Sequence, residues 1–154
     1  MPLFSRFWVD PTKTKSDPKR LLIQGPALQV QIDVPDDLAA VLVRDGKPVP
    51  PPQAGTALID TGASFTAVEE VSLKALGLVP VGTNPIWTPS GPKDHPIYAC
   101  KISFPGTPIQ PLTFNAVVGC QLQGFGHQAL IGRDILQYFL LVYNGVEGTW
   151  TLAF

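Results

Sequence analysis

Residues 57–64 read Ala-Leu-Ile-Asp-Thr-Gly-Ala-Ser, and this stretch decides how the rest of the chain is interpreted. Three apolar residues typical of a strand lead into Asp60, and a small, flexible turn follows at once. A carboxylate at the end of an apolar strand is costly, because a buried charge must be paired or neutralised. Chains keep such groups mainly where chemistry requires them. Asp60 is therefore a candidate catalytic residue, and Thr61, Gly62 and Ala63 form the loop around it.

The composition of the chain favours one mainly β domain. A chain of 154 residues can bury a core of its own. Hydrophobic residues make up 45% of the chain and charged residues 15%, a balance that excludes disorder for the chain as a whole. The 17 prolines and 14 glycines, beside many β-branched and aromatic residues, indicate strands joined by frequent turns.

Charge and hydropathy patterning exclude several classes of function. The net charge of -1 comes from 11 basic and 12 acidic residues without a long basic run, so we expect no nucleic-acid partner and no membrane partner. The strongly apolar run 139–143 is too short to span a bilayer, and the N-terminus has no apolar signal segment. We therefore expect a cytoplasmic location.

Two cysteines, Cys100 and Cys120, are not spaced as a zinc site. Free thiols in a reducing compartment are the simpler interpretation, with a disulfide as the alternative. Cys100 follows Tyr98 on an expected strand, so we expect it to be a small buried hydrophobe. His95 and His127 are too few and too scattered for a metal site, and we expect both at the surface.

The chain before the Asp60 loop divides into an N-terminal arm and loop, residues 1–20, and the start of a domain that covers residues 21–154. The arm is interpreted either as a terminal strand packing on its own domain or as an arm crossing to a partner subunit. Residues 21–34 are expected as a strand, because apolar and polar residues alternate strictly from Leu28 to Val34. The short apolar run 38–43 precedes a hairpin-type turn, and the prolines that follow predict a stiff connecting loop.

The chain after the Asp60 loop predicts a short helix and then more strands. The expected elements are a helix over 68–76 with Val71 on its buried face and Gly77 at its end, a hairpin over 86–104 with its tip at 88–92, a strand near 112–118, a loop over 121–128, a short helix over 135–138, and a terminal hairpin of 140–143 and 149–154.

The chemistry that suits Asp60 needs a second carboxylate. Two close carboxylates share one proton because both cannot ionise cheaply, and the pair then holds an acid and a base that together hydrolyse a peptide bond. Glycine lets the backbone approach the carboxylate, and the Thr61 hydroxyl can tie two such loops together. Asp33, Asp94 and Asp134 do not repeat the Asp-Thr-Gly pattern. One chain therefore carries half a site.

Residues 54–154 resemble the retropepsin-like aspartic proteases, the cellular and bacterial relatives of the retroviral enzymes. The resemblance rests on the Asp-Thr-Gly-Ala loop, the hairpin after it, and the segment 130–134, Leu-Ile-Gly-Arg-Asp, followed by a short helix and a last strand. It implies a mainly β, single-lobe closed β-barrel with one or two short helices, and a C2 homodimer in which each copy supplies Asp60. The implied activity is that of an aspartic endopeptidase on extended peptides, without a metal or other cofactor.

The resemblance also implies roles around the site. It implies a flap that covers substrate, formed by Trp87, Thr88, Pro89, Ser90 and Gly91, and structural support of the site from Gly132, Arg133 and Asp134.

Two departures from the family pattern leave alternatives open. Ser64 and Phe65 stand where retroviral enzymes commonly place an acidic partner for the arginine, so Arg133 is expected to pair elsewhere. The Pro-Ser-Gly-Pro tip is stiffer than a glycine-rich one. Trp87 and Tyr98 either line the cleft or only pack the hairpin. Rival functions are a catalytically silent dimer that acts as a peptide-binding or adaptor module, and a precursor whose first 20 residues occlude the cleft.

Overall fold

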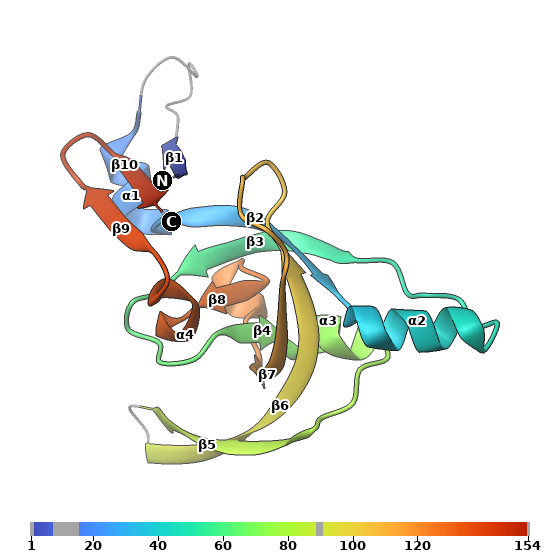
Figure 1. The fold of residues 1–154 in the computed structure, drawn as a ribbon. Helices are drawn as coiled ribbons and strands as arrows, with labels where there is room; N and C mark the ends of the chain where they lie inside the picture. Colours follow the sequence, from blue (N-terminus) through green and yellow to red (C-terminus); the bar gives the residue numbers. More distant parts are fainter. Residues whose placement is uncertain (1, 8–15, 89–90, 154) are drawn as a thin grey trace.

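The computed structural model describes residues 2–7, 16–88 and 91–153, and the fold is mainly β (Figure 1). The chain forms a three-stranded sheet of order β1-β10-β9 and a seven-stranded sheet of order β2-β3-β8-β4-β7-β6-β5. Strand β2 also pairs with β6, so the pairings from β2 to β6 run in a closed circuit. No helix in these described ranges is long and apolar enough to cross a membrane.

The strand bounds are β1 (Leu3–Phe7), β2 (Ala27–Asp33), β3 (Gln53–Ile59), β4 (Ala67–Glu69), β5 (Gly82–Thr88), β6 (Gly91–Ser103), β7 (Leu112–Cys120), β8 (Ala129–Ile131), β9 (Leu140–Asn144) and β10 (Thr149–Ala153). The helix bounds are α1 (Pro18–Gln24), α2 (Asp36–Arg44), α3 (Glu70–Ala75) and α4 (Arg133–Leu136), with one 3₁₀ turn, η1 (Gln123–Phe125).

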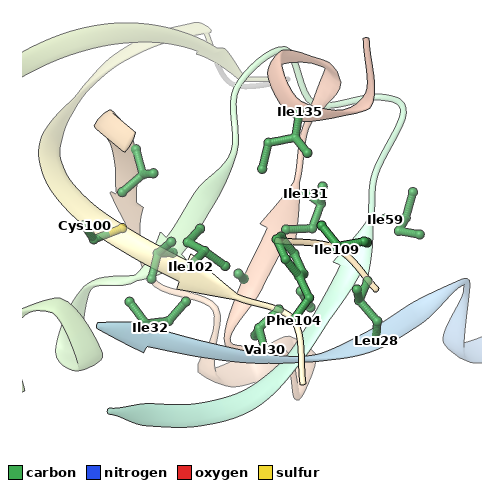
Figure 2. Packing of buried hydrophobic residues seen from close by; sticks show 14 of the residues in the cluster. Leu28, Val30, Ile32, Ile59, Cys100, Ile102, Phe104, Ile109, Ile131 and Ile135 are labelled. Carbon is green, nitrogen blue, oxygen red and sulfur yellow. The ribbon is translucent and has the colours of Figure 1, made fainter. Parts of the chain in front are cut away.

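The alternation predicted for β2 is confirmed. Leu28, Val30 and Ile32 are buried, and the residues between them are exposed or half-buried. Figure 2 shows these three side chains in the core with residues of β3, β6, β8 and α4. Because successive side chains of a strand point to opposite faces, β2 buries one face and leaves the other accessible.

The core also contains Tyr98 and Cys100, both fully buried on β6. Burial raises the pKa of the Cys100 thiol to about 12, as expected for a cysteine that acts as a small hydrophobe. Burial and a hydrogen bond to Glu70 likewise raise the pKa of Tyr98 to about 12. Tyr98 therefore packs the hairpin and does not line the cleft. Cys100 and Cys120 are both free thiols.

The strand predicted to begin at Leu21 is wrong in its first part, because residues 18–24 form the helix α1. Asp17 accepts hydrogen bonds from the backbone N–H groups of Lys19 and Arg20, and Pro18 occupies the first turn, where its missing N–H costs nothing. Gly25, with φ of 67°, ends the helix before β2 begins. The N-cap at Asp17 was the missed signal.

The hairpin predicted around 38–47 is also wrong, because residues 36–44 form the helix α2. Asp36 and Asp37 occupy the first turn and Arg44 the last turn, so the charges at both ends interact favourably with the helix dipole. No residue of α2 is fully buried, and the helix projects from the body of the fold on the right of Figure 1. The proline-rich segment after it is a connecting loop, as predicted.

The helix predicted over 68–76 begins two residues later, at Glu70, because Val68 is taken up by strand β4 between β7 and β8. Val71 is 56% exposed, so its predicted place on the buried face is wrong. Gly77, with φ of 71°, follows the helix end as predicted.

The later hairpins are confirmed. Strands β5 and β6 form the predicted long hairpin, beginning four residues before its expected start, and its tip at Pro89 and Ser90 lies outside the described residues. Strand β7 extends the predicted strand to Cys120, and the loop after it contains the single turn η1. The short helix α4 begins two residues earlier than predicted.

The C-terminal strands β9 and β10 pair as predicted, and β1 pairs with β10 of the same chain. In this chain the N-terminal strand therefore packs on its own domain, which is the first of the two interpretations of the arm. The boundary at residue 20 falls inside helix α1 and stays an expectation.

Candidate active site

Asp60 stands at the end of β3, where its backbone is fixed from the neighbouring strand. The Asp60 N–H donates to the Ile131 carbonyl at 3.0 Å, and β3 runs parallel to β8 up to that point. The half-buried carboxylate accepts the Gly62 N–H at 2.8 Å. A Cβ on Gly62 would lie 3.1 Å from the same carboxylate oxygen, so glycine permits this close approach. The turn thus points one oxygen of Asp60 at its own backbone.

Arg133, the first residue of α4, clamps the outer side of the Asp60 loop. Its guanidinium donates to the Thr61 carbonyl at 2.8 Å and to the Ser64 hydroxyl at 2.8 Å. Its backbone N–H donates to the Ala63 carbonyl at 3.0 Å. Arg133 therefore binds the loop directly, where the family pattern would give it an acidic partner, and Ser64 takes part of that role.

Thr66 and Asp134 form a second tie beneath the loop. The Asp134 carboxylate accepts both the Thr66 N–H and the Thr66 hydroxyl at 2.8 Å. The Thr66 hydroxyl in turn accepts the Gly132 N–H at 3.1 Å, and Thr66 is fully buried. Every polar group of this tie thus has a partner, which a buried network requires. Gly132, Arg133 and Asp134 all hold the loop rather than face the hollows described below.

Gly132 has no room for a side chain. A Cβ there would lie 2.5 Å from the Phe65 carbonyl carbon and 2.8 Å from the Thr66 nitrogen, which are backbone atoms. We expect Gly132→Ala to lower the free energy of unfolding by about 2–3 kcal/mol, because the loop and α4 must separate. The matched control is Gly124→Ala, where a Cβ meets nothing within 4 Å and the change should stay within about 0.5 kcal/mol. Urea denaturation measures both, and equal effects would contradict the clamp.

A hollow of about 360 Å³ lies between the Asp60 loop and the β5–β6 hairpin; we call it the hairpin hollow. It is lined by Gly62, Ala63, Phe65, Trp87, Val118 and Leu130 among others. Trp87 is 81% exposed and lies at this hollow, so it is open to solvent there, and its role in a substrate cleft stays a prediction. Thr88 ends β5 and Gly91 begins β6, while Pro89 and Ser90 fall outside the described residues.

A second hollow, of about 570 Å³, includes Asp60 itself; we call it the Asp60 hollow. Its walls are mainly apolar and come from α1, from β3 and β8, and from the β7–β8 loop, through Leu22, Ile23, Leu58, Phe125, His127 and Leu130. Leu22, Ile23 and Phe125 are each more than 70% exposed, at 79%, 80% and 74%. Exposed apolar side chains around a carboxylate suit the binding of an apolar ligand. Of the described residues that line this hollow, Asp60 alone carries a carboxylate.

His127 lines the Asp60 hollow and His95 the hairpin hollow, and both are half-buried. The Nδ1 of His127 lies 3.2 Å from the Thr56 hydroxyl, and burial lowers the pKa of the ring below its ordinary value of about 6.5.

This lowered pKa predicts a pH dependence of stability. The unfolded chain binds a proton near pH 6.5, but the folded chain resists it, so the free energy of unfolding should fall as the pH drops from 7.5 to 5. His127→Gln should show a smaller fall over the same window. Urea denaturation at several pH values checks this, and an NMR titration of the ring gives the pKa directly. Parallel curves for the two proteins would contradict it.

Several lining residues were missed in the sequence. Leu22, Ile23 and Phe125 sit on a short helix and a loop without strong periodicity, and only the chain topology brings them to Asp60. The one local signal for this wall of the hollow was the apolar pair Leu22 and Ile23, which precedes Gln24 and Gly25. Among the described residues, no group of three His, Cys, Asp or Glu side chains is placed to hold a metal ion.

Comparison with known proteins finds similarity only among solved structures. No family model and no curated protein matches the sequence. The chain is similar to the solution structure of simian foamy virus (mac) protease, with 18% identity over 73% of this chain and 93% of that one and a TM-score of 0.45. It is similar to a retropepsin-like aspartic protease from Rickettsia conorii, with 11% identity over 97% and 90% of the two chains and a TM-score of 0.46.

A third similarity is to the foamy viral protease-reverse transcriptase in complex with an RNA/DNA hybrid, with 19% identity and a TM-score of 0.47 over 75% of this chain and 12% of that one. These are similarities to a retropepsin-like fold.

Proposed function

We propose that this chain is one subunit of a homodimeric aspartic endopeptidase, in which two Asp60 carboxylates, one from each copy, activate a water molecule against a peptide bond. The observation that carries the proposal is the Asp60 loop itself. Asp60 lines the Asp60 hollow, and the backbone of its loop is held by Ile131 and Arg133. The second carboxylate that the chemistry needs is absent from the described residues around that hollow.

The proposed reaction follows from two carboxylates that share a proton. The ionised one takes a proton from water while the protonated one donates to the carbonyl oxygen of the substrate, and the roles return when the products leave. An extended peptide would lie between the Asp60 loop and the β5–β6 hairpin, which we propose as the flap. Its side chains would enter the hairpin hollow and the Asp60 hollow, and its backbone would form strand-like hydrogen bonds.

The edge strand β9 supports the proposed dimer. It reads Leu-Leu-Val-Tyr-Asn over residues 140–144, without a charge or a proline, and it is an edge of the three-stranded sheet. Unprotected edge strands pair with other chains. Antiparallel pairing of β9 with its own copy is self-complementary, as a two-fold axis requires. In Figure 1, β9, the loop between β3 and β4, and the end of the β5–β6 hairpin lie on the same side of the view.

The experiment that tests the proposal is a cleavage assay of a peptide library from acid to neutral pH, with and without a transition-state mimic of aspartic proteases. Cleavage that the mimic blocks supports an endopeptidase. Peptides that bind without being cut would favour the silent binding module instead. A chain that begins near Leu21 tests whether the first residues occlude the cleft, because removal of an inhibitory segment raises activity.

A further inference from the structure

The β7–β8 loop, residues 121–128, crosses the end of a short strand that lies beneath it. In the larger sheet β4 is placed between β8 and β7, pairing antiparallel with the first and parallel with the second. The loop that joins β7 to β8 must therefore pass over one end of β4. The last residue of β4 at that end is Glu69, in register with Cys120.

Glu69 holds both ends of this loop. Its backbone N–H donates to the Gln128 carbonyl at 2.8 Å, at the end of the loop. Its carboxylate Oε2 accepts the Leu122 N–H at 2.5 Å, at the start of the loop. Leu122 is itself buried, so this N–H would otherwise lack a partner away from water.

The carboxylate of Glu69 is unusual because it is buried and only one of its two oxygens accepts a hydrogen bond among the described residues. Glu69 is 6% exposed, and its Oε1 has no hydrogen-bond partner among the described residues. A buried carboxylate with an unpaired oxygen costs free energy that an apolar side chain of the same shape would not. The presence of a carboxylate at this position is explained by the need for a hydrogen-bond acceptor for the Leu122 N–H.

The loop that Glu69 holds carries part of the Asp60 hollow. Phe125 and His127 line that hollow together with Asp60. The far end of the loop is also tied to β3, because the Gln128 N–H donates to the Thr56 carbonyl at 2.7 Å. The near end is held by Glu69 through the Leu122 N–H, and the Phe125 N–H donates to the Leu122 carbonyl at 2.8 Å.

We propose that Glu69 is a positioning residue for substrate binding, which sets the place of Phe125 and His127 at the Asp60 hollow by holding the Leu122 N–H. This inference rests on the proposed function for its kinetic consequence, but not for its structural one. Glu69 touches neither the substrate nor Asp60, and its effect on peptide cleavage passes through the loop 121–128.

Three variants separate the acceptor from the charge and from the length of the side chain. Glu69→Gln keeps an oxygen at the same reach, Glu69→Met keeps the length without an acceptor, and Glu69→Asp keeps the charge but shortens the reach by one bond. The matched control is Glu70→Gln at the next position, because the Glu70 carboxylate pairs with Lys74 and Tyr98 and not with the loop.

Two readouts are measured: hydrogen exchange of the segment 121–128, and KM and kcat for a cleaved peptide. In Glu69→Met we expect exchange in this segment about tenfold faster and KM about tenfold higher, with kcat changed less than about threefold, because one charged hydrogen bond is lost. Glu69→Asp should behave in the same way, and it replaces Glu69→Met if that variant does not fold. Glu69→Gln and Glu70→Gln should stay within about threefold of the parent for both readouts.

Unchanged exchange and unchanged KM in Glu69→Met and Glu69→Asp would overturn the proposal. So would faster exchange across all strands with kcat and KM altered together, since that is the result of a general loss of stability. If the parent protein cleaves no peptide, the proposed function fails. The exchange of residues 121–128 then decides the role of Glu69 alone.

Discussion

Replacing Asp60 with asparagine should abolish the proposed peptide cleavage and leave the fold and the proposed dimer intact. The amide has the size of the carboxylate and keeps an oxygen that can accept the Gly62 N–H, so the loop geometry is retained. A side-chain amide does not titrate in this pH range, so two facing amides supply neither a general acid nor a general base. Because one substitution removes both the acid and the base of a symmetric site, we expect kcat/KM to fall by at least about 10³-fold. Peptide cleavage measures the loss, and circular dichroism checks the fold.

The control is Asp37→Asn, which removes an exposed carboxylate from α2 with the same change of net charge. A mixing experiment sharpens the result. When the parent chain is diluted with Asp60→Asn and the subunits exchange, only dimers of two parent chains keep both carboxylates. Activity should then fall with the square of the parent fraction. A linear fall would mean that each chain acts alone, and residual cleavage by pure Asp60→Asn would remove Asp60 from the mechanism.

The parts of the fold that could be predicted are those with a strong local pattern. The alternation of Leu28, Val30 and Ile32 identifies β2 because a half-buried strand places every second side chain in the core. The Asn-Gly pair at 144–145 indicates the terminal hairpin for a similarly local reason, although Asn144 pairs with Thr149 and residues 145–148 form the turn. Gly77 likewise marks the end of α3, since its positive φ is one that other residues avoid.

The helices α1 and α2 could not be read from apolar runs, because each is short and buries little. Only Leu21 is buried in α1, and α2 has no fully buried residue. Their signals lie at the ends, in the Asp17 cap and in the acidic first turn of α2, and a reading based on periodicity passes over such signals. Strand β4 was not predicted because its strand conformation depends on pairing with distant strands. Three residues give no pattern of their own, and pairing with β7 and β8 alone makes them a strand.

The candidate site divides in the same way. Asp60 and Arg133 were found because their motifs are local, and their contacts explain the spacing: Arg133 reaches the Thr61 carbonyl only because β8 lies beside β3. Glu69 and Phe125 carry no motif. Phe125 lines the Asp60 hollow, and Glu69 contacts the loop that carries Phe125, because β4 is inserted between the strands that the β7–β8 loop connects. That insertion is a property of sheet order and not of sequence spacing.

Introducing a charge at Val142 should separate the proposed dimer and stop the proposed cleavage. Val142 is the middle residue of β9 and is 49% exposed, so a longer polar side chain is accommodated in one copy. We expect the two-fold axis of the proposed dimer to pass at this middle residue, so that antiparallel pairing of β9 with its own copy places the two Val142 side chains opposite each other. Two lysines or two glutamates there repel, and an edge lysine also opposes strand pairing.

We therefore expect Val142→Lys and Val142→Glu each to be monomeric and to lose about tenfold or more of the activity at a fixed chain concentration, since separated chains each hold one Asp60. Mixing the two variants should restore both the dimer and cleavage, because lysine then faces glutamate and each dimer again contains two Asp60 side chains. The control is Val43→Lys, an exposed valine of α2, the helix that lies on the side of Figure 1 opposite to β9. Sedimentation and peptide cleavage measure the outcome. A monomeric Val142→Lys that cleaves at the parent rate would show that one copy suffices, and a dimeric one would move the interface away from β9.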